Sequence, residues 1–266
     1  MHRFDQDISL AAVTPLLLNG NITDNWSING IPNGGYIMAL LAGAMLQCTD
    51  KKEYPILTAN YISKCVPGKG DFAVEIISNA NQLNRLQVRL LQKGMEKVRA
   101  IGTFTGKKNG SLPERIEAPA PDIFPLEDCV PFPARPHYSL FNQMDVRLDP
   151  RCAGWLQGNF SGRSEQKGWI RFRDERMFDV PALALIADTF PPAVLAAYPM
   201  VDWVPTIEYS VHIRHVPDTR WLKCVFRTRF ISCGLIEEDG RIWDENGKIV
   251  AISRQIAQFR PAGPQP

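Results

Sequence analysis

One carboxylate of the chain stands where ionised side chains are rare. Asp188 lies in the segment LALIADTFPPAV, among leucine, isoleucine, alanine, valine and phenylalanine residues. An acid buried there loses its hydration and needs hydrogen-bonding partners, and such an acid can take a proton from a water molecule. A structural role is the alternative, because the carboxylate could instead cap a backbone group or form a local turn toward Pro191.

A second segment offers backbone groups for chemistry. In IPNGGYIMALLAGAML, the residues Asn33, Gly34 and Gly35 stand directly before a long apolar stretch. A helix that begins there would present free N–H groups and the positive end of its dipole, and glycine lets a ligand approach such a backbone closely. These groups could stabilise an oxyanion. Asn is also a good N-cap, and Gly-Gly can form a tight turn between a strand and a helix, so both interpretations stay open.

The two segments occupy the same place in two halves that repeat one order of elements. In the first half, a predicted helix over residues 36–46 precedes four short, roughly alternating segments that are typical of antiparallel strands. In the second half, residues 181–198 take the place of the helix, and four similar segments follow. A Val-Pro pair, at residues 66–67 and 216–217, marks the same point in each half.

This repeat predicts the fold. A helix that is apolar on nearly every side needs burial over most of its surface, and a curved antiparallel sheet wrapped around it provides that burial. We therefore predict an α+β tandem, or double, hotdog fold, in which each unit is one central helix and its sheet. The N-terminal unit spans residues 1–105, a proline-rich linker spans residues 106–136, and the C-terminal unit spans residues 137–266.

Composition argues against several classes of protein. Hydrophobic residues make up 45% of the chain and charged residues 22%, which are values of an ordinary globular protein. Basic and acidic residues are interleaved and the net charge is only +2, so we expect no nucleic-acid partner. No apolar run is long enough for a membrane span. The scattered cysteines, and first residues without the pattern of a secretory signal, predict reduced thiols in the cytoplasm.

Three motifs of the second half resemble those of a known family. Asp188 precedes two prolines, Thr206 lies at the start of PTIEYSVHIRHVP, and Gln255 lies late in KIVAISRQIAQFRP. In the order and spacing of these motifs the sequence resembles the acyl-CoA thioesterase II family, the double-hotdog thioesterases, over nearly the whole chain. The resemblance implies that the three residues form a catalytic set that binds the attacking water. Tyr36, directly after the two glycines, departs from the usual helix start of that family.

The first half provides an internal comparison for these positions. Gly43 stands where the second half has Asp188, and Phe104 stands where it has Gln255. The fold therefore does not require a polar side chain at either place. Taken alone, Gln255 could lie on a solvated face of the sheet, and Thr206 could be an ordinary strand residue.

The resemblance implies hydrolysis of an acyl-CoA thioester to a free carboxylic acid and CoA. In that reaction Asp188 would be the general base, while the hydroxyl of Thr206 and the amide of Gln255 would fix the water. The helix start at residues 33–35 would supply the hydrogen-bond donors for the oxyanion. One chain would then hold one active site, to which both halves contribute.

Other mechanisms lack their residues. The sequence has no G-x-S-x-G motif, which a serine nucleophile of an α/β-hydrolase would need. His212 and His215 lie three apart on a predicted strand and therefore on opposite faces, which argues against joint metal ligation. Related hotdog dehydratases have a His a few residues after the helix Asp, and the residues directly after Asp188 do not match that pattern. We expect no metal and no bound cofactor, since CoA is part of the substrate.

Two other functions fit the same fold. A non-catalytic module could bind acyl-CoA or a lipid-like ligand in the same pocket, and a purely structural tandem domain would bind no ligand. Release of thiol from acyl-CoA separates the first of these from an enzyme. For the enzyme, the resemblance implies an acyl-CoA as the partner and assembly into homodimers or larger homo-oligomers.

Overall fold

The first half of the chain folds as one long helix and a set of antiparallel strands. The computed structural model describes residues 1–106, 115–198 and 201–261. The helices of the first half are α1 (Arg3–Asp7) and α2 (Gly34–Gln47), and one 3-10 turn is η1 (Asp24–Trp26). Its strands are β1 (Leu10–Thr14), β2 (Leu17–Ile22), β3 (Ser27–Ile28), β4 (Ile31–Pro32), β5 (Glu53–Tyr61), β6 (Gly68–Asn79), β7 (Leu83–Gln92) and β8 (Met95–Thr105). The predicted helix and the four strand segments after it are confirmed.

The second half repeats this order with a shorter helix. Its helices are α3 (Leu140–Gln143) and α4 (Val180–Ile186), and its 3-10 turns are η2 (Leu126–Asp128), η3 (Gly154–Gln157) and η4 (Ala193–Ala196). Its strands are β9 (Val130–Pro131), β10 (Met144–Leu148), β11 (Glu165–Phe172), β12 (Val201–Trp203), β13 (Thr206–Ile213), β14 (Leu222–Arg227), β15 (Ile231–Ser232), β16 (Leu235–Asp244), β17 (Ile249–Gln258) and β18 (Arg260–Pro261).

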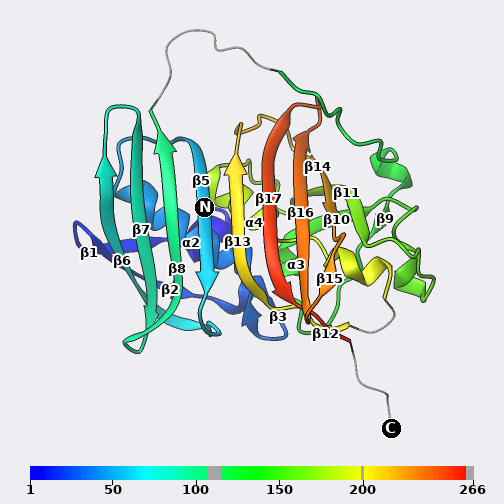
Figure 1. Ribbon diagram of the computed structural model, residues 1–266, viewed down its shortest axis with the longest axis horizontal. Coiled ribbons are helices and arrows are strands. Elements are labelled where there is room, and N and C mark those ends of the chain that lie inside the picture. Colours follow the sequence, from blue (N-terminus) through cyan, green and yellow to red (C-terminus); the bar gives the residue numbers. More distant parts are fainter. Residues whose placement is uncertain (107–114, 199–200, 262–266) are drawn as a thin grey trace.

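Most of the strands join in one large antiparallel sheet (Figure 1). Within the described residues, 14 strands form this sheet, in the order β1-β2-β6-β7-β8-β5-β13-β17-β16-β14-β11-β10-β9, with β15 paired to β16. Helices α2 and α4 lie together on one face of the sheet, and their buried side chains belong to the main hydrophobic core.

The two halves meet at β5 and β13, which pair antiparallel at the centre of the sheet. Outward from this pair, β8, β7 and β6 on one side correspond to β17, β16 and β14 on the other. The hydroxyl oxygens of Thr58 and Ser210 lie 2.8 Å apart across the join. The predicted double hotdog is therefore confirmed, and its two units share one continuous sheet.

Helix α2 is buried because its side chains are apolar on nearly every side. Of its 14 residues, 10 are buried, and they pack against β6, β7, β8 and α4. Asn33 caps the helix, since its Oδ1 accepts a hydrogen bond from the Tyr36 N–H at 3.0 Å. This cap fixes where the helix begins. None of the helices in the described ranges is long and apolar enough to cross a membrane.

Helix α4 is much shorter than the segment predicted for it. The sequence pattern predicts a helix over the whole of residues 181–198, but α4 ends at Ile186 and is followed only by the 3-10 turn η4. Pro191 and Pro192 explain the difference, because proline has no N–H to continue the hydrogen-bond ladder and its ring clashes with the preceding turn. Asp188 therefore lies in the turn after α4 rather than inside a helix.

The end of the predicted linker lies against the second half. Residues 107–114 of this segment are outside the described part of the chain. Beyond them, the Phe124 N–H donates to the buried carboxylate of Asp149 at 3.1 Å, and β9 pairs with β10. The division of the chain into residues 1–105, 106–136 and 137–266 stays a prediction.

Candidate active site

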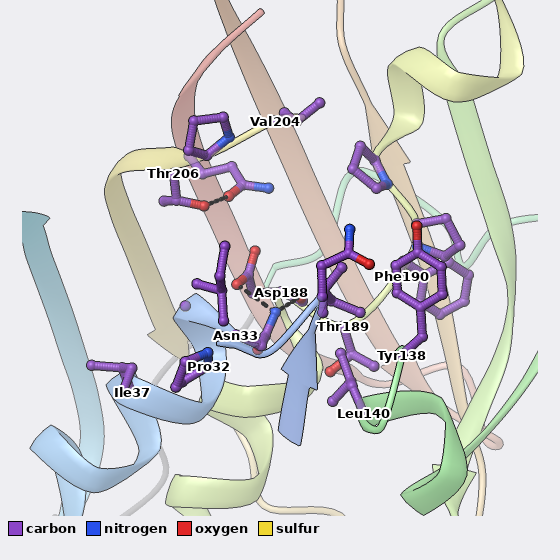
Figure 2. A pocket seen from close by; sticks show the side chains of 18 of the residues that line it. Pro32, Asn33, Ile37, Tyr138, Leu140, Asp188, Thr189, Phe190, Val204 and Thr206 are labelled. Carbon is purple, nitrogen blue, oxygen red and sulfur yellow. Dashed lines mark hydrogen bonds between the residues drawn. The ribbon is translucent and has the colours of Figure 1, made fainter. Parts of the chain in front are cut away.

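A cavity of about 440 Å³ collects residues from both halves of the chain. Most of the predicted site residues line it, namely Asn33, Gly34, Asp188, Thr206 and Gln255. Gly35 lies beside them and reaches Asp188 through its backbone N–H. Figure 2 shows Asp188 and Asn33 together in the middle of this pocket, with Thr206 to one side. The fold therefore brings all the predicted site residues together.

Asp188 is held by the start of the helix of the other half. Its own N–H donates to the carbonyl oxygen of Leu185, in the last turn of α4, at 3.1 Å. Its Oδ2 accepts hydrogen bonds from the Gly35 N–H at 2.7 Å and from Asn33 Nδ2 at 3.1 Å. The same Asn33 amide donates to the Asp188 carbonyl oxygen at 2.9 Å. The orientation of the Asp188 carboxylate is thus fixed by Gly35 and Asn33, which precede it in the chain by 153 and 155 positions.

The two glycines allow this contact because they carry no Cβ. A Cβ at Gly35 would lie 2.6 Å from the carbonyl oxygen of Leu185, so a larger residue would push α2 and α4 apart. A Cβ at Gly34 would lie 2.9 Å from Asp188 Oδ2 and 3.4 Å from the Tyr61 hydroxyl oxygen. The glycines therefore serve the close approach between the helix start and the acid.

The N–H groups of the two glycines have different surroundings. The Gly35 N–H donates to Asp188, whereas the Gly34 N–H makes no hydrogen bond to any described residue. The Gly34 carbonyl oxygen accepts from the Tyr61 hydroxyl at 2.6 Å, which holds this turn in place. The predicted oxyanion role therefore narrows to the Gly34 N–H, and it stays a prediction.

Tyr36, which directly follows the two glycines, does not line the cavity. Its side chain is fully buried, and its hydroxyl donates to the carbonyl oxygen of Asp7 at 2.8 Å. The Thr23 N–H in turn donates to the Tyr36 hydroxyl at 3.2 Å. Tyr36 thus ties α2 to the first residues of the chain and leaves the shape of the pocket to other side chains.

The surroundings of Asp188 make it a weak acid. The side chain keeps some exposure to the pocket, but the protein around it removes most of its hydration, which raises its pKa from 3.8 to about 7. The hydrogen bonds from Gly35 and Asn33, and the amide of Gln255, act in the opposite direction. An acid with a pKa near neutrality exists in both protonation states at pH 7, so it is suited to proton transfer.

Thr206 and Gln255 form a hydrogen-bonded pair on neighbouring strands. Thr206 begins β13, and Gln255 lies in β17, the strand that pairs with β13. The Thr206 hydroxyl donates to Gln255 Oε1 at 2.9 Å. Because both side chains line the pocket that contains Asp188, a water there can meet a carboxylate, a hydroxyl and an amide.

One acid of the site has no counterpart among the predicted residues. Glu238 lies in β16 directly opposite Gln255 and is only 4% exposed. Its Oε1 accepts from Gln255 Nε2 at 3.1 Å, and its Oε2 accepts from the Ala193 N–H at 2.6 Å. The sequence does carry a signal for it, because Glu238 shares the buried face of an alternating strand with Ile236 and Gly240.

The pocket also has an aromatic wall, formed by Phe132, Tyr138, Phe141 and Trp155, which was not predicted. The centre of the Phe132 ring lies 4.4 Å from that of Phe141 and 6.2 Å from that of Trp155. Tyr138 meets Phe141 edge to face at 6.4 Å. Figure 2 shows Tyr138 and Phe190 on the opposite side of Asp188 from Thr206. These residues lie in or beside short, irregular elements, where no periodicity shows which side chains turn inward.

Two basic residues stand at the solvent side of the pocket. Lys64 and Arg135 line the cavity and are exposed, and the guanidinium carbon of Arg135 lies 5.9 Å from the centre of the Phe132 ring. Among the described residues, no group of three or more His, Cys, Asp or Glu side chains could hold a metal ion. The positive charges of Lys64 and Arg135 favour an anionic ligand at this side of the pocket.

Two domain models of one family match the sequence. The model of the acyl-CoA thioesterase N-terminal domain matches residues 22–105, and that of the acyl-CoA thioesterase C-terminal domain matches residues 126–259. Among curated proteins, the uncharacterized protein Rv0499 of Mycobacterium tuberculosis is 23% identical over 264 residues, which cover 91% of this chain and 90% of that protein. The uncharacterized protein Mb0510 of Mycobacterium bovis matches to the same extent.

Solved structures resemble the chain over nearly its whole length. A Thermobifida fusca protein described provisionally as a thioesterase II has a TM-score of 0.89 at 23% identity, with 98% of each chain covered. A hot dog fold protein of unknown function from Alicyclobacillus acidocaldarius has a TM-score of 0.88 at 21% identity, covering 99% of this chain and 100% of that one. The acyl-CoA thioesterase II TesB2 of Mycobacterium marinum has a TM-score of 0.75 at 20% identity, covering 98% of this chain and 100% of that one. These likenesses support the double-hotdog fold.

Proposed function

Since this chain belongs to the acyl-CoA thioesterase family, we propose that it hydrolyses an acyl-CoA thioester to a free carboxylic acid and CoA. One observation carries the proposal. Asp188, an acid with a pKa near neutrality because of its burial, is anchored by the start of α2 in the pocket that the Thr206–Gln255 pair also lines. Its Oδ2 holds the helix start, which leaves Oδ1 for a water molecule.

The proposed reaction uses one water and no covalent intermediate. Asp188 takes a proton from the water while the water oxygen attacks the carbonyl carbon of the thioester. The Gly34 N–H, at the positive end of the α2 dipole, donates to the oxyanion that forms. The C–S bond then breaks, and the proton held by Asp188 passes to the CoA thiolate. One thioester and one water thus give one carboxylic acid and one thiol.

In this proposal the acyl group lies against the aromatic wall, and the CoA phosphates lie near the basic residues. Aromatic rings offer apolar surface for an acyl chain, which gains free energy by leaving water. Lys64 and Arg135 at the solvent side attract the phosphates. The thioester carbonyl then lies between them, beside Asp188.

We expect Tyr138→Ala to raise the KM for acyl-CoAs with an acyl chain of several carbons by up to about tenfold, because an aromatic contact is lost. The kcat should change little, since the side chain makes no hydrogen bond to Asp188, Thr206 or Gln255. Acetyl-CoA, which offers one methyl group to the wall, should keep its KM. Tyr54→Ala, which alters an exposed tyrosine of β5, is the control. An unchanged KM for every acyl chain would place the acyl group elsewhere.

The Thr206–Gln255 pair provides a second test. Gln255→Leu should lower kcat by about 10²-fold because the water loses its orientation, and Thr206→Val by about tenfold because one hydrogen bond is lost. Since the two side chains act as one unit, the double variant should be no slower than Gln255→Leu alone. Strictly multiplicative effects in steady-state kinetics would contradict a joint role.

Thiol release from a panel of acyl-CoAs tests the proposed function itself. If the protein is an enzyme, at least one acyl-CoA of the panel should release CoA thiol at a rate proportional to the protein concentration. Binding of acyl-CoA without thiol release from any chain length would support the non-catalytic alternative. If neither CoA nor acyl-CoA raised the melting temperature, a purely structural role would be supported.

Three further properties belong to the proposal. The scattered cysteines, which form no disulfide among the described residues, favour a cytoplasmic location. The reaction needs neither a metal nor a bound cofactor, because water, a general base and backbone donors suffice for it. As the family resemblance implies, the chains assemble into homodimers or larger homo-oligomers.

A further inference from the structure

Glu238 is a buried acid beside the proposed site. It is 4% exposed, and no ion pair with a Lys or Arg of the described residues is formed. Both of its oxygens accept hydrogen bonds instead, Oε1 from Gln255 Nε2 at 3.1 Å and Oε2 from the Ala193 N–H at 2.6 Å. An ionised carboxylate in such a place loses hydration, so it depends on these two hydrogen bonds.

The fold does not demand this charge. In the first half, Phe104 occupies the place of Gln255, and the residue directly opposite Phe104 in the sheet is Asn84. Asn84 is also buried, at 3% exposure, but it is uncharged. The equivalent position can therefore hold a neutral side chain when its strand neighbour is not part of the proposed site.

The hydrogen-bond pattern around Glu238 favours its ionised form. The amide of Gln255 has an oxygen end and a nitrogen end, and the Thr206 hydroxyl donates to the oxygen end. The nitrogen end must then donate to its other neighbour, Glu238. The Ala193 N–H donates to the second oxygen, so each oxygen of Glu238 faces an N–H donor, and the ionised carboxylate, which only accepts, fits this arrangement best.

We propose that Glu238 is a positioning residue for the hydrolysis proposed above, and the inference rests on that function. Its carboxylate fixes the Gln255 amide in one of two orientations, so that the oxygen accepts from Thr206. One N–H of the amide donates to Glu238, and the other is left for Asp188 or its water. Glu238 itself touches no substrate, since it does not line the cavity.

Protonation of Glu238 would disrupt this arrangement. Burial raises the pKa of Glu238 to about 7, the hydrogen bonds from Ala193 and Gln255 oppose that rise, and the negative charges of Asp188 and Glu237 add to it. A proton on either oxygen adds an O–H donor and weakens that oxygen as an acceptor, although both oxygens face N–H groups. The active form therefore needs both Asp188 and Glu238 ionised, and the logarithm of kcat/KM should fall with a slope approaching two below the pKa values of the pair.

Glu238→Gln tests the proposal, because glutamine has the same shape but only one acceptor oxygen. We expect kcat for acyl-CoA to fall about 10²-fold with KM changed less than threefold, and the slope of the pH profile to fall from two to one. Glu238→Asp keeps two acceptor oxygens, so it should keep the slope of two and lose less activity. Glu208→Gln, which alters an exposed glutamate of β13, is the matched control and should behave as wild type.

A double-variant comparison separates positioning from a structural role. In a Gln255→Leu background, Glu238→Gln should cost no further kcat, because its effect passes through Gln255. If the wild type is active and Glu238→Gln keeps the wild-type kcat and pH slope, the positioning role is overturned but the proposed function is not. The same conclusion follows if Glu238→Gln lowers kcat as much in the Gln255→Leu background as in the wild type. If Glu238→Gln does not fold, a slope of one in Glu238→Asp would overturn it. A wild type that releases no thiol would overturn the proposed function, and this inference with it.

Discussion

Replacing Asp188 with Asn should slow thiol release from acyl-CoA by about 10³-fold, since loss of a general base costs about 10²- to 10⁴-fold. The asparagine keeps an oxygen that can accept from the Gly35 N–H and the Asn33 amide, so the contact between the halves survives. The substituted side chain cannot take a proton from water. Steady-state thiol release at pH 8, where the wild-type acid is ionised, measures the effect.

The same substitution should not destabilise the protein. At pH 8 the wild type keeps a charge in surroundings that hydrate it poorly, and Asp188→Asn removes that charge. Thermal unfolding at pH 8 should therefore give the variant an equal or higher Tm. Asp218→Asn, which alters an exposed aspartate, should change neither rate nor Tm. Hydrolysis by Asp188→Asn at the wild-type rate would refute the proposed mechanism.

The direction of the pKa shift also sets how stability depends on pH. Burial raises the pKa of Asp188 from 3.8 to about 7, so between these values the folded state binds more protons than the unfolded state. The free energy of unfolding should therefore decrease as pH rises from about 4 to about 7, in the range where the rate of thiol release increases. Asp188→Asn should keep only the part of this dependence that comes from Glu238, whose burial raises its pKa to about 7.

Gly34→Ala should lower kcat by about 10²-fold, the effect expected when one donor to an oxyanion is displaced. The added Cβ would lie 2.9 Å from Asp188 Oδ2, so the helix start or the acid must move. The N–H of residue 34 would then no longer point to the place of the oxyanion. The affinity for a non-hydrolysable acyl-CoA analogue should change much less than kcat.

Gly43 provides a matched control in the same helix. A Cβ at Gly43 would meet no atom within 4 Å, so Gly43→Ala adds the same methyl group without a clash. It should keep full activity and raise the free energy of unfolding by up to about 1 kcal/mol, because alanine favours helix. Equal losses of kcat and affinity in Gly34→Ala would mean that the glycine serves only the turn.

Local patterns in the sequence were enough for the architecture. The apolar stretch over residues 36–46 predicts a helix buried on all sides, and the alternating segments after it predict antiparallel strands. Both come from the chemistry of neighbouring residues, and the repeat of this order predicts the tandem. The predicted length of α4 was wrong. The pattern of apolar residues continues past Pro191 and Pro192, but the backbone hydrogen bonds of a helix cannot continue through these prolines.

The sequence by itself determined the fold and the candidate acid, hydroxyl and amide at Asp188, Thr206 and Gln255, since these follow from residue order and from resemblance. Only the tertiary structure decided what each of them contacts. The Gly35 N–H binds Asp188 across 153 residues, and Glu238 meets Gln255 across a strand pair. Such contacts depend on sheet register and on the distance between two helices, and no local pattern of residues encodes either of these.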